Sequence, residues 1–256
     1  MIKALITDLD RTLLHTDKTV SQHTLQVLRT CKEKGILIMA ASARPMRFIR
    51  TYHELIHFDA VTTMNGAVLC TPEGVKEFGI SRELAETVLE RICAFPDVFL
   101  SVETSTGLYS NREIPAWNPI LYHDFPKLPD NAMVYKILAS SEDEMLYKGI
   151  DSVLCDGVYS SIAHSGVVGQ LIQIMSDKAT KWNGVQTMLA HFGIEPTDAV
   201  YFGDDNDDIE PIVKCGVGVA MGNAIPAVLE ASDELTLCND EDGVAHWIKK
   251  SVLCNL

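Results

Sequence analysis

Mostly apolar runs alternate along the chain with stretches whose apolar residues recur at helical spacing. The runs at 2–6, 36–41 and 60–64 are typical of strands buried in a parallel sheet. Between the first two runs, residues 22–34 place their apolar side chains on one face, which predicts a helix with Ser21 as its N-cap. The alternation of strand and helix predicts a parallel sheet covered by helices.

The middle of the chain has a different pattern. It contains predicted helices at 81–94 and 142–148, predicted strands at 98–103, 107–111, 134–139, 158–164 and 170–175, and a proline-rich irregular stretch at 112–131. Because strands here often follow strands, we expect an antiparallel sheet with helices on one face. We therefore predict an inserted α+β domain at 81–175.

After residue 175 the first pattern returns. Helices are predicted at 181–192, 209–214 and 244–252, and strands at 199–202, 217–220 and 234–237. The fold class that we predict is α/β, with 1–80 and 176–256 forming one parallel-sheet domain around the insertion.

Charge and composition limit the classes of partner. The 256 residues carry a net charge of −14, and 47% of them are hydrophobic. An acidic chain lacks the basic face that nucleic acids or anionic membranes require, and no apolar stretch approaches the roughly 20 residues of a membrane span. The N-terminus shows no signal-peptide pattern. The seven cysteines are widely spaced without a CxxC pair, which indicates free thiols in a cytoplasmic protein.

Polar residues cluster where the predicted strands end or a helix begins. Asp8 and Asp10 follow the first strand, Ser42 follows the second, and Lys181 begins a helix. The acidic run GDDNDD at 203–208 follows a later strand. These ends meet at one edge of a parallel sheet, so the clusters can form one pocket. Close carboxylates repel unless a cation or proton lies between them, and Mg²⁺ is the usual partner. Read one by one, the same residues could be turn residues, helix caps or solvated side chains.

The combination and order of these clusters resemble the haloacid dehalogenase superfamily of aspartyl phosphotransferases. The matching segments are DLDRTLL (8–14), ASARP (41–45), Lys181 and GDDNDD (203–208), while NGA (65–67), VGVAMGNA (217–224) and NDEDGVA (239–245) resemble the Cof-type branch, class IIB. The resemblance implies a Rossmann-like core with an inserted α/β cap of the C2B type. It also implies a magnesium-dependent phosphoric monoester hydrolase of small phosphorylated metabolites, such as sugar phosphates, nucleotides or cofactor phosphates.

The resemblance further implies a role for each matching residue. Asp8 would be the nucleophile that forms an aspartyl phosphate, and Asp10 would be the general acid and base. The implied Mg²⁺ ligands are Asp8, Asp10 through its backbone carbonyl, Asp204 and Asp208. The implied phosphate-binding residues are Leu9, Ser42, Ala43, Lys181 and Asp207, and Arg11 and Arg44 are candidate substrate contacts.

Two positions depart from the family pattern. Arg11 stands where this branch usually has glycine, so a side chain must fit a turn that suits glycine. We expect Arg11 to point toward the mouth of the site and to attract an anionic substrate. Asp207 stands where the family has asparagine, and its carboxylate can only accept hydrogen bonds, so phosphate binding should be weaker.

Three other functions fit parts of the pattern. A phosphomutase of the same superfamily keeps both Asp8 and Asp10, and a non-catalytic phosphometabolite-binding or regulatory protein would explain Arg11 and Asp207. A phosphorylated signalling receiver also uses an aspartate, a lysine and magnesium, but such domains are about half this length. The sequence does not predict an oligomeric state.

Overall fold

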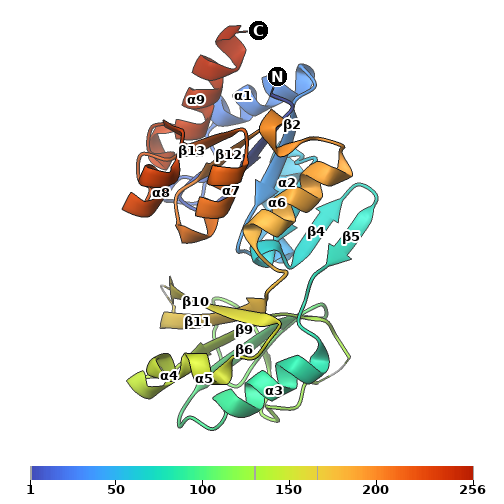
Figure 1. Ribbon diagram of the computed structural model, residues 1–256, viewed down its shortest axis with the longest axis vertical. Helices are drawn as coiled ribbons and strands as arrows, with labels where there is room; N and C mark the ends of the chain where they lie inside the picture. Colours follow the sequence, from blue (N-terminus) through green and yellow to red (C-terminus); the bar gives the residue numbers. More distant parts are fainter. Residues whose placement is uncertain (1, 130, 166, 256) are drawn as a thin grey trace. The chain divides into compact units, whose positions relative to one another are not determined.

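The computed structural model describes residues 2–129, 131–165 and 167–255. The chain divides into two compact units, of which the first combines residues up to Glu77 with those from Thr180 onward. The second unit is Phe78–Ala179. Figure 1 shows the elements of each unit.

The first unit contains a sheet in which the described residues form eight strands in the order β14-β13-β12-β1-β2-β3-β4-β5. The strands are β1 Ala4–Thr7, β2 Leu37–Ala41, β3 Ala60–Thr63, β4 Val68–Thr71, β5 Gly74–Glu77, β12 Ala199–Gly203, β13 Val217–Ala220 and β14 Glu234–Leu235. All neighbours from β14 to β3 are parallel, while β3, β4 and β5 pair in antiparallel fashion. The predicted α/β class and central parallel sheet are confirmed.

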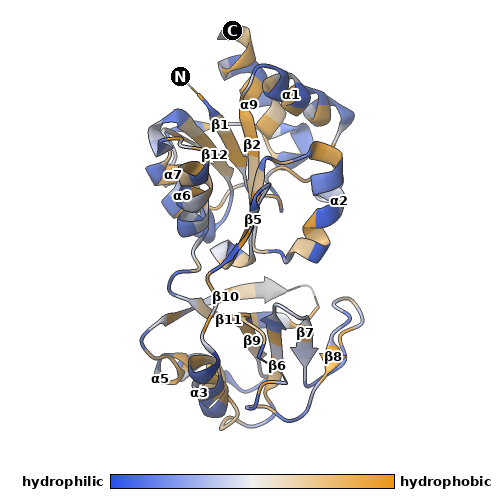
Figure 2. Cartoon of the chain, turned by 90° about the vertical axis from the view of Figure 1, so that its right-hand side faces the viewer, coloured by the Kyte–Doolittle hydropathy of each residue, from blue (hydrophilic) through white to orange (hydrophobic). Residues whose placement is uncertain are grey.

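Helices cover both faces of this sheet. They are α1 Gln22–Glu33, α2 Met46–Ile56, α6 Lys181–His191, α7 Ile209–Lys214, α8 Pro226–Ala231 and α9 Gly243–Ser251. Helices α1, α2 and α9 lie on one face, and α6 and α7 on the other (Figure 2). Ser21 caps α1 as predicted, because its Oγ accepts a 2.9 Å hydrogen bond from the Thr24 amide. None of the described helices is both long enough and apolar enough to span a membrane.

The second unit contains a separate sheet, in the order β10-β11-β9-β6-β7-β8. Its strands are β6 Phe99–Thr104, β7 Leu108–Ser110, β8 Ile120–Leu121, β9 Val134–Ser140, β10 Val158–Ser165 and β11 Gly169–Ser176. Helices α3 Arg82–Ile92, α4 Glu144–Lys148 and α5 Ile150–Val153 contribute to one apolar core with Leu100, Ile137 and Ile172 of the sheet. A smaller apolar cluster contains Phe99, Leu138 and Leu171. Neighbouring strands are antiparallel, apart from the parallel pair β7 and β8.

Three short strands were not predicted from the sequence. β5 is exposed at every position, β8 has two exposed residues, and β4 follows directly on the turn at η1 (Met64–Gly66). β5 and β8 have neither a long apolar run nor a regular alternation, so pairing with a neighbour defines them instead. β4 does contain an apolar run, Val68 to Cys70, which was not interpreted as a strand.

Gly66 lets the η1 turn approach the start of helix α6. Its φ angle is +102°, and a Cβ atom at this position would lie 2.1 Å from the backbone oxygen of Thr180. Thr180 is the N-cap of α6, since its Oγ1 accepts a 3.1 Å hydrogen bond from the Asn183 amide. Gly66 therefore allows the backbone of η1 to lie against the start of α6, where Lys181 is the first residue.

Replacing Gly66 by alanine should reduce the free energy of unfolding by about 3 kcal/mol, because both the left-handed angle and the backbone clash oppose a side chain. Gly35→Ala is the matched control. Gly35 also has a positive φ, +80°, but a Cβ there meets nothing within 4 Å, so the cost should be about 1 kcal/mol. Urea unfolding of both variants measures the difference, and equal losses would show that the approach to Thr180 is not constrained.

Candidate active site

A buried lysine joins two of the predicted carboxylates. Asp8 directly follows β1, and Lys181 is the first residue of α6. The Lys181 Nζ atom lies 2.8 Å from Asp8 Oδ1 and 2.6 Å from Asp208 Oδ1. All three residues are at most 5% exposed. The fold thus brings together residues separated by up to about two hundred positions, as the strand-end argument predicted.

Asp208 accepts four hydrogen bonds. Its Oδ1 accepts from Lys181 and from the Tyr201 hydroxyl at 2.7 Å. Its Oδ2 accepts from the backbone amides of Asp204 and Asp205, at 3.0 and 3.1 Å. These contacts fix the loop after β12 and orient the Lys181 ammonium. Tyr201 was missed in the sequence, where it is one residue of an apolar strand.

Asp8, Asp204 and Asp208 form a cluster that suits a cation. Carboxylate oxygens of the three residues lie within 4.8 Å of one another. With Lys181 as the buried ammonium, three ionised carboxylates would leave two negative charges, which the exposed Arg11 guanidinium, 3.6 Å from Asp204, offsets only in part. Oxygen donors and this charge fit a hard divalent cation. Because the contacts of Asp208 are already made, Asp8 and Asp204 are the residues best placed to hold it.

Burial changes the protonation of this cluster. It raises the pKa of Asp8 to about 8, although the nearby Lys181 ammonium acts in the opposite direction. It raises the pKa of Asp204 to about 6, in spite of a 2.8 Å hydrogen bond from Thr12 Oγ1. Burial would lower the pKa of Lys181, but Asp208 and Asp8 outweigh it and raise this pKa. Lys181 is therefore charged, and a cation that binds below these raised pKa values must displace protons from Asp8 and Asp204.

The Asp10 side chain has other partners. Arg44 contacts both of its oxygens, with Nε 2.5 Å from Oδ2 and Nη2 2.6 Å from Oδ1. Lys18 Nζ lies 2.7 Å from Oδ1. Partial burial would raise the pKa of Asp10, but Arg44 and Lys18 outweigh it and lower this pKa. Lys18 was not predicted as a site residue.

The remaining predicted residues surround these groups. Ser42 is buried at the end of β2, where its Oγ accepts a 3.2 Å hydrogen bond from the Arg44 amide, while Ala43 beside it is exposed. Leu9 is fully buried between Asp8 and Asp10. Asp207 accepts a hydrogen bond from the Asn65 side-chain amide, which brings η1 to the acidic loop.

Arg11 occupies the left-handed conformation that its glycine-like position implied, with a φ of +61°. Its Nε lies 3.6 Å from Asp204 Oδ2. Its Nη2 donates to the Asn223 carbonyl at 3.0 Å, and the Asn223 side chain donates back to the Arg11 carbonyl at 2.8 Å. Asn239 extends the network, because its amide donates to Asn223 and its side chain donates to the Leu14 carbonyl. The segments 217–224 and 239–245 thus support the turn after β1.

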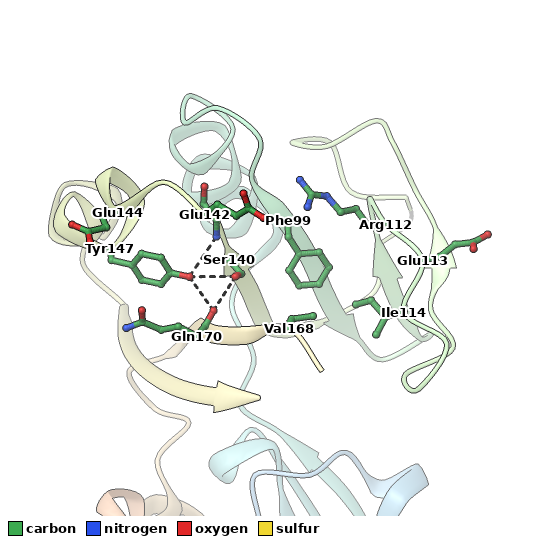
Figure 3. Close-up of a pocket in the computed structure, with 11 residues that line it drawn as sticks. Phe99, Arg112, Glu113, Ile114, Ser140, Glu142, Glu144, Tyr147, Val168 and Gln170 are labelled. Carbon is green, nitrogen blue, oxygen red and sulfur yellow. Dashed lines mark hydrogen bonds between the residues drawn. The ribbon is translucent and has the colours of Figure 1, made fainter. Parts of the chain in front are cut away.

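The second unit has a cavity of its own, of about 400 Å³. Figure 3 shows Tyr147, Ser140 and Gln170 joined by hydrogen bonds, with Phe99 and Ile114 also in its lining. The Tyr147 hydroxyl donates to the Gln170 carbonyl at 2.9 Å. All predicted site residues belong to the first unit, and none of them lines this cavity.

Comparison with known proteins gives consistent matches over nearly the whole chain. A family model described as haloacid dehalogenase-like hydrolase matches residues 5–248. A protein of Bacillus subtilis (strain 168) named "Putative phosphatase YxeH" is 28% identical, with 99% of each chain covered. The 5-amino-6-(5-phospho-D-ribitylamino)uracil phosphatase YitU of the same organism is 26% identical over 95% of each chain. The solved structure of the HAD subclass IIB sugar phosphatase BT4131 superposes with a TM-score of 0.77 at 23% identity, covering 97% of this chain and 98% of that one, which shows a shared fold.

Magnesium should stabilise the protein more at about pH 8 than at about pH 6. Without a cation, the raised pKa values of Asp8 and Asp204 mean that the folded state binds more protons than the unfolded state. Stability then falls as pH rises from about 4 to about 8, and a cation that replaces those protons restores it. Thermal unfolding with and without Mg²⁺ measures the effect as a shift of several degrees. Asp204→Asn should lose most of the shift, and an equal or smaller shift at the higher pH would contradict the assignment.

Proposed function

The chain belongs to the haloacid dehalogenase-like hydrolase family, and from this we propose that it is a magnesium-dependent phosphatase that hydrolyses small phosphorylated metabolites through an aspartyl phosphate. The observation that carries the proposal is the buried contact of Lys181 with both Asp8 and Asp208 beside Asp204. The closeness of an aspartate that could act as nucleophile, an ammonium and a candidate cation site supports the proposal, because phosphoryl transfer relies on positioning and charge neutralisation.

Asp8 is the proposed nucleophile. Attack of one carboxylate oxygen on phosphorus would form the aspartyl phosphate and release the alcohol, and water would then hydrolyse the acyl phosphate. Lys181, 2.8 Å from Asp8, would neutralise charge on the nucleophile and on the transferring group. A bound Mg²⁺, held by Asp8 and Asp204, would reduce the repulsion between carboxylate and phosphate. The Asp10 backbone carbonyl is the further ligand that the family resemblance implies.

Asp10 is the proposed general acid and base, which would protonate the leaving oxygen and then deprotonate the attacking water. Its contacts with Arg44 and Lys18 favour the ionised carboxylate, so these cations must be drawn away for Asp10 to carry a proton. The Ser42 hydroxyl and the backbone amides of Leu9 and Ala43 would bind phosphoryl oxygens, together with Lys181.

Asp207 fits this scheme differently from the asparagine of the family pattern. Its carboxylate accepts the hydrogen bond of Asn65 and has no proton to donate to a phosphate. We propose that Asp207 anchors η1 to the acidic loop rather than binding phosphate through its own side chain.

The second unit is the proposed cap domain, which in this family gives substrate selectivity. The relatives named above include a phosphatase of a phosphorylated ribityl compound and a sugar phosphatase, so phosphorylated polyols and sugars are the first substrates to assay. The cytoplasm is the proposed location, because all seven cysteines are free thiols.

Release of para-nitrophenol from para-nitrophenyl phosphate with Mg²⁺ tests the proposal. Asp8→Asn should reduce kcat at least about a thousandfold, because the amide cannot form the acyl phosphate. Asp205→Asn is the matched control, since it removes one exposed carboxylate of the same acidic loop and keeps a capping oxygen for Asn206. Its activity should stay within about threefold of wild type. Equal activity of wild type and Asp8→Asn would refute the nucleophile assignment.

A further inference from the structure

Two cations share a single carboxylate at the edge of the carboxylate cluster. Arg44 contacts both oxygens of Asp10 and Lys18 contacts one of them, at distances of 2.5–2.7 Å. The side chains of Asp10 and Lys18 are 38% and 49% exposed, against 21% for Arg44. The group therefore borders solvent, where an incoming molecule can reach it.

The fold holds both cations in place through Tyr52 of helix α2. The Tyr52 hydroxyl donates a 2.9 Å hydrogen bond to the Lys18 carbonyl, and the Arg44 guanidinium lies 5.7 Å from the centre of the Tyr52 ring. Lys18 has a left-handed φ of +68°, an unfavourable conformation that persists only where the surroundings impose it. The backbone carbonyl of Arg44 accepts a 3.1 Å hydrogen bond from the Met64 amide.

The group formed by Arg44, Lys18 and Asp10 carries a net positive charge. Three carboxylates, Lys181 and a divalent cation would sum to zero in the buried cluster, and the exposed Arg11 guanidinium lies 3.6 Å from Asp204 as a further cation. Arg44, Lys18 and Asp10 together leave one more positive charge. In a chain of net charge −14, an excess cation beside the site favours an additional anion. The planar fork of Arg44 suits a carboxylate or phosphate that binds through two oxygens.

The proposed role of Asp10 indicates which part of the substrate the two cations would meet. If its carboxylate faces the leaving oxygen, then groups in direct contact with that carboxylate lie on the leaving-group side. In the proposed mechanism the phosphoryl group itself would lie with Asp8 and Lys181. A substrate anion at Arg44 and Lys18 would therefore belong to the part of the substrate that departs.

We propose that Arg44 and Lys18 form a subsite for a second anionic group of the substrate, which the Asp10 carboxylate occupies in the free protein. The preferred substrates are then phosphate monoesters that carry a carboxylate or another phosphate close to the ester oxygen. When that anion binds the two cations, it frees Asp10 to contact the leaving oxygen. The inference rests on the proposed phosphatase function and specifies its substrate class.

A matched pair of substrates tests the subsite. 2-Phosphoglycerate carries a carboxylate where β-glycerol phosphate carries a hydroxymethyl group, and the two molecules are otherwise alike. The wild-type protein with Mg²⁺ should show a kcat/KM at least about tenfold higher for 2-phosphoglycerate, as one charge-assisted interaction provides. The ratio should fall to about one in Arg44→Met and in Lys18→Met. Because the ratio is taken within each variant, a loss common to both substrates cancels.

Arg50→Met is the control for long-range charge, since it removes an exposed arginine from the same helix α2. It should keep the wild-type ratio. A wild-type ratio near one would overturn the subsite while hydrolysis of both esters still supported the phosphatase function. An unchanged ratio in both Arg44→Met and Lys18→Met would also overturn it. If neither ester is hydrolysed, calorimetric dissociation constants that do not favour 2-phosphoglycerate would reject the subsite. The phosphatase proposal fails separately, if para-nitrophenyl phosphate is not hydrolysed either.

Discussion

The contact of Lys181 with Asp8 and Asp208 is the interaction on which the first unit depends most. Three carboxylates in a buried site would repel one another strongly, and removing the ammonium would leave them uncompensated. The position of the ammonium is set by backbone structure. Thr180 caps α6, and Gly66 allows η1 to lie against it. The Tyr201 hydroxyl also donates a hydrogen bond to Asp208 and so helps to hold this carboxylate in place.

Residues far away in the sequence also stabilise the turn after β1. Thr12 donates to Asp204, and Asn223 and Asn239 bind the backbone of Arg11 and Leu14. This support explains how Arg11 fits a position suited to glycine, because its unfavourable φ angle is offset by specific hydrogen bonds. Together with the hydrogen bond from Asn65 to Asp207, it weakens the case for a non-catalytic protein, which rested on these two departures.

The sequence predicted the parts of the fold that carry a periodic signal. Buried strands such as β1 and β2 appeared as apolar runs, and strand ends placed Asp8, Lys181 and the acidic loop together. The contacts of Asp10 with Arg44 and Lys18 could not be predicted, because they depend on side-chain directions and on a turn with a left-handed residue. Tyr201 and the partners of Asn239, which begins the matching segment 239–245, were missed for a related reason, since these contacts are defined only by tertiary packing. The short strands β5 and β8 lack a pattern of their own, whereas β4 is a short apolar run that was missed.

The most direct measurement of the central claim is the site of covalent phosphorylation. An Asp10→Asn variant should form the aspartyl phosphate and hydrolyse it slowly, because the amide cannot activate water. Mixing this variant with para-nitrophenyl phosphate and Mg²⁺, quenching in acid and mapping peptides by mass spectrometry should place one phosphoryl group on Asp8. A phosphoryl group on another residue, or steady hydrolysis with no phosphorylated Asp8 on the reaction timescale, would contradict the account.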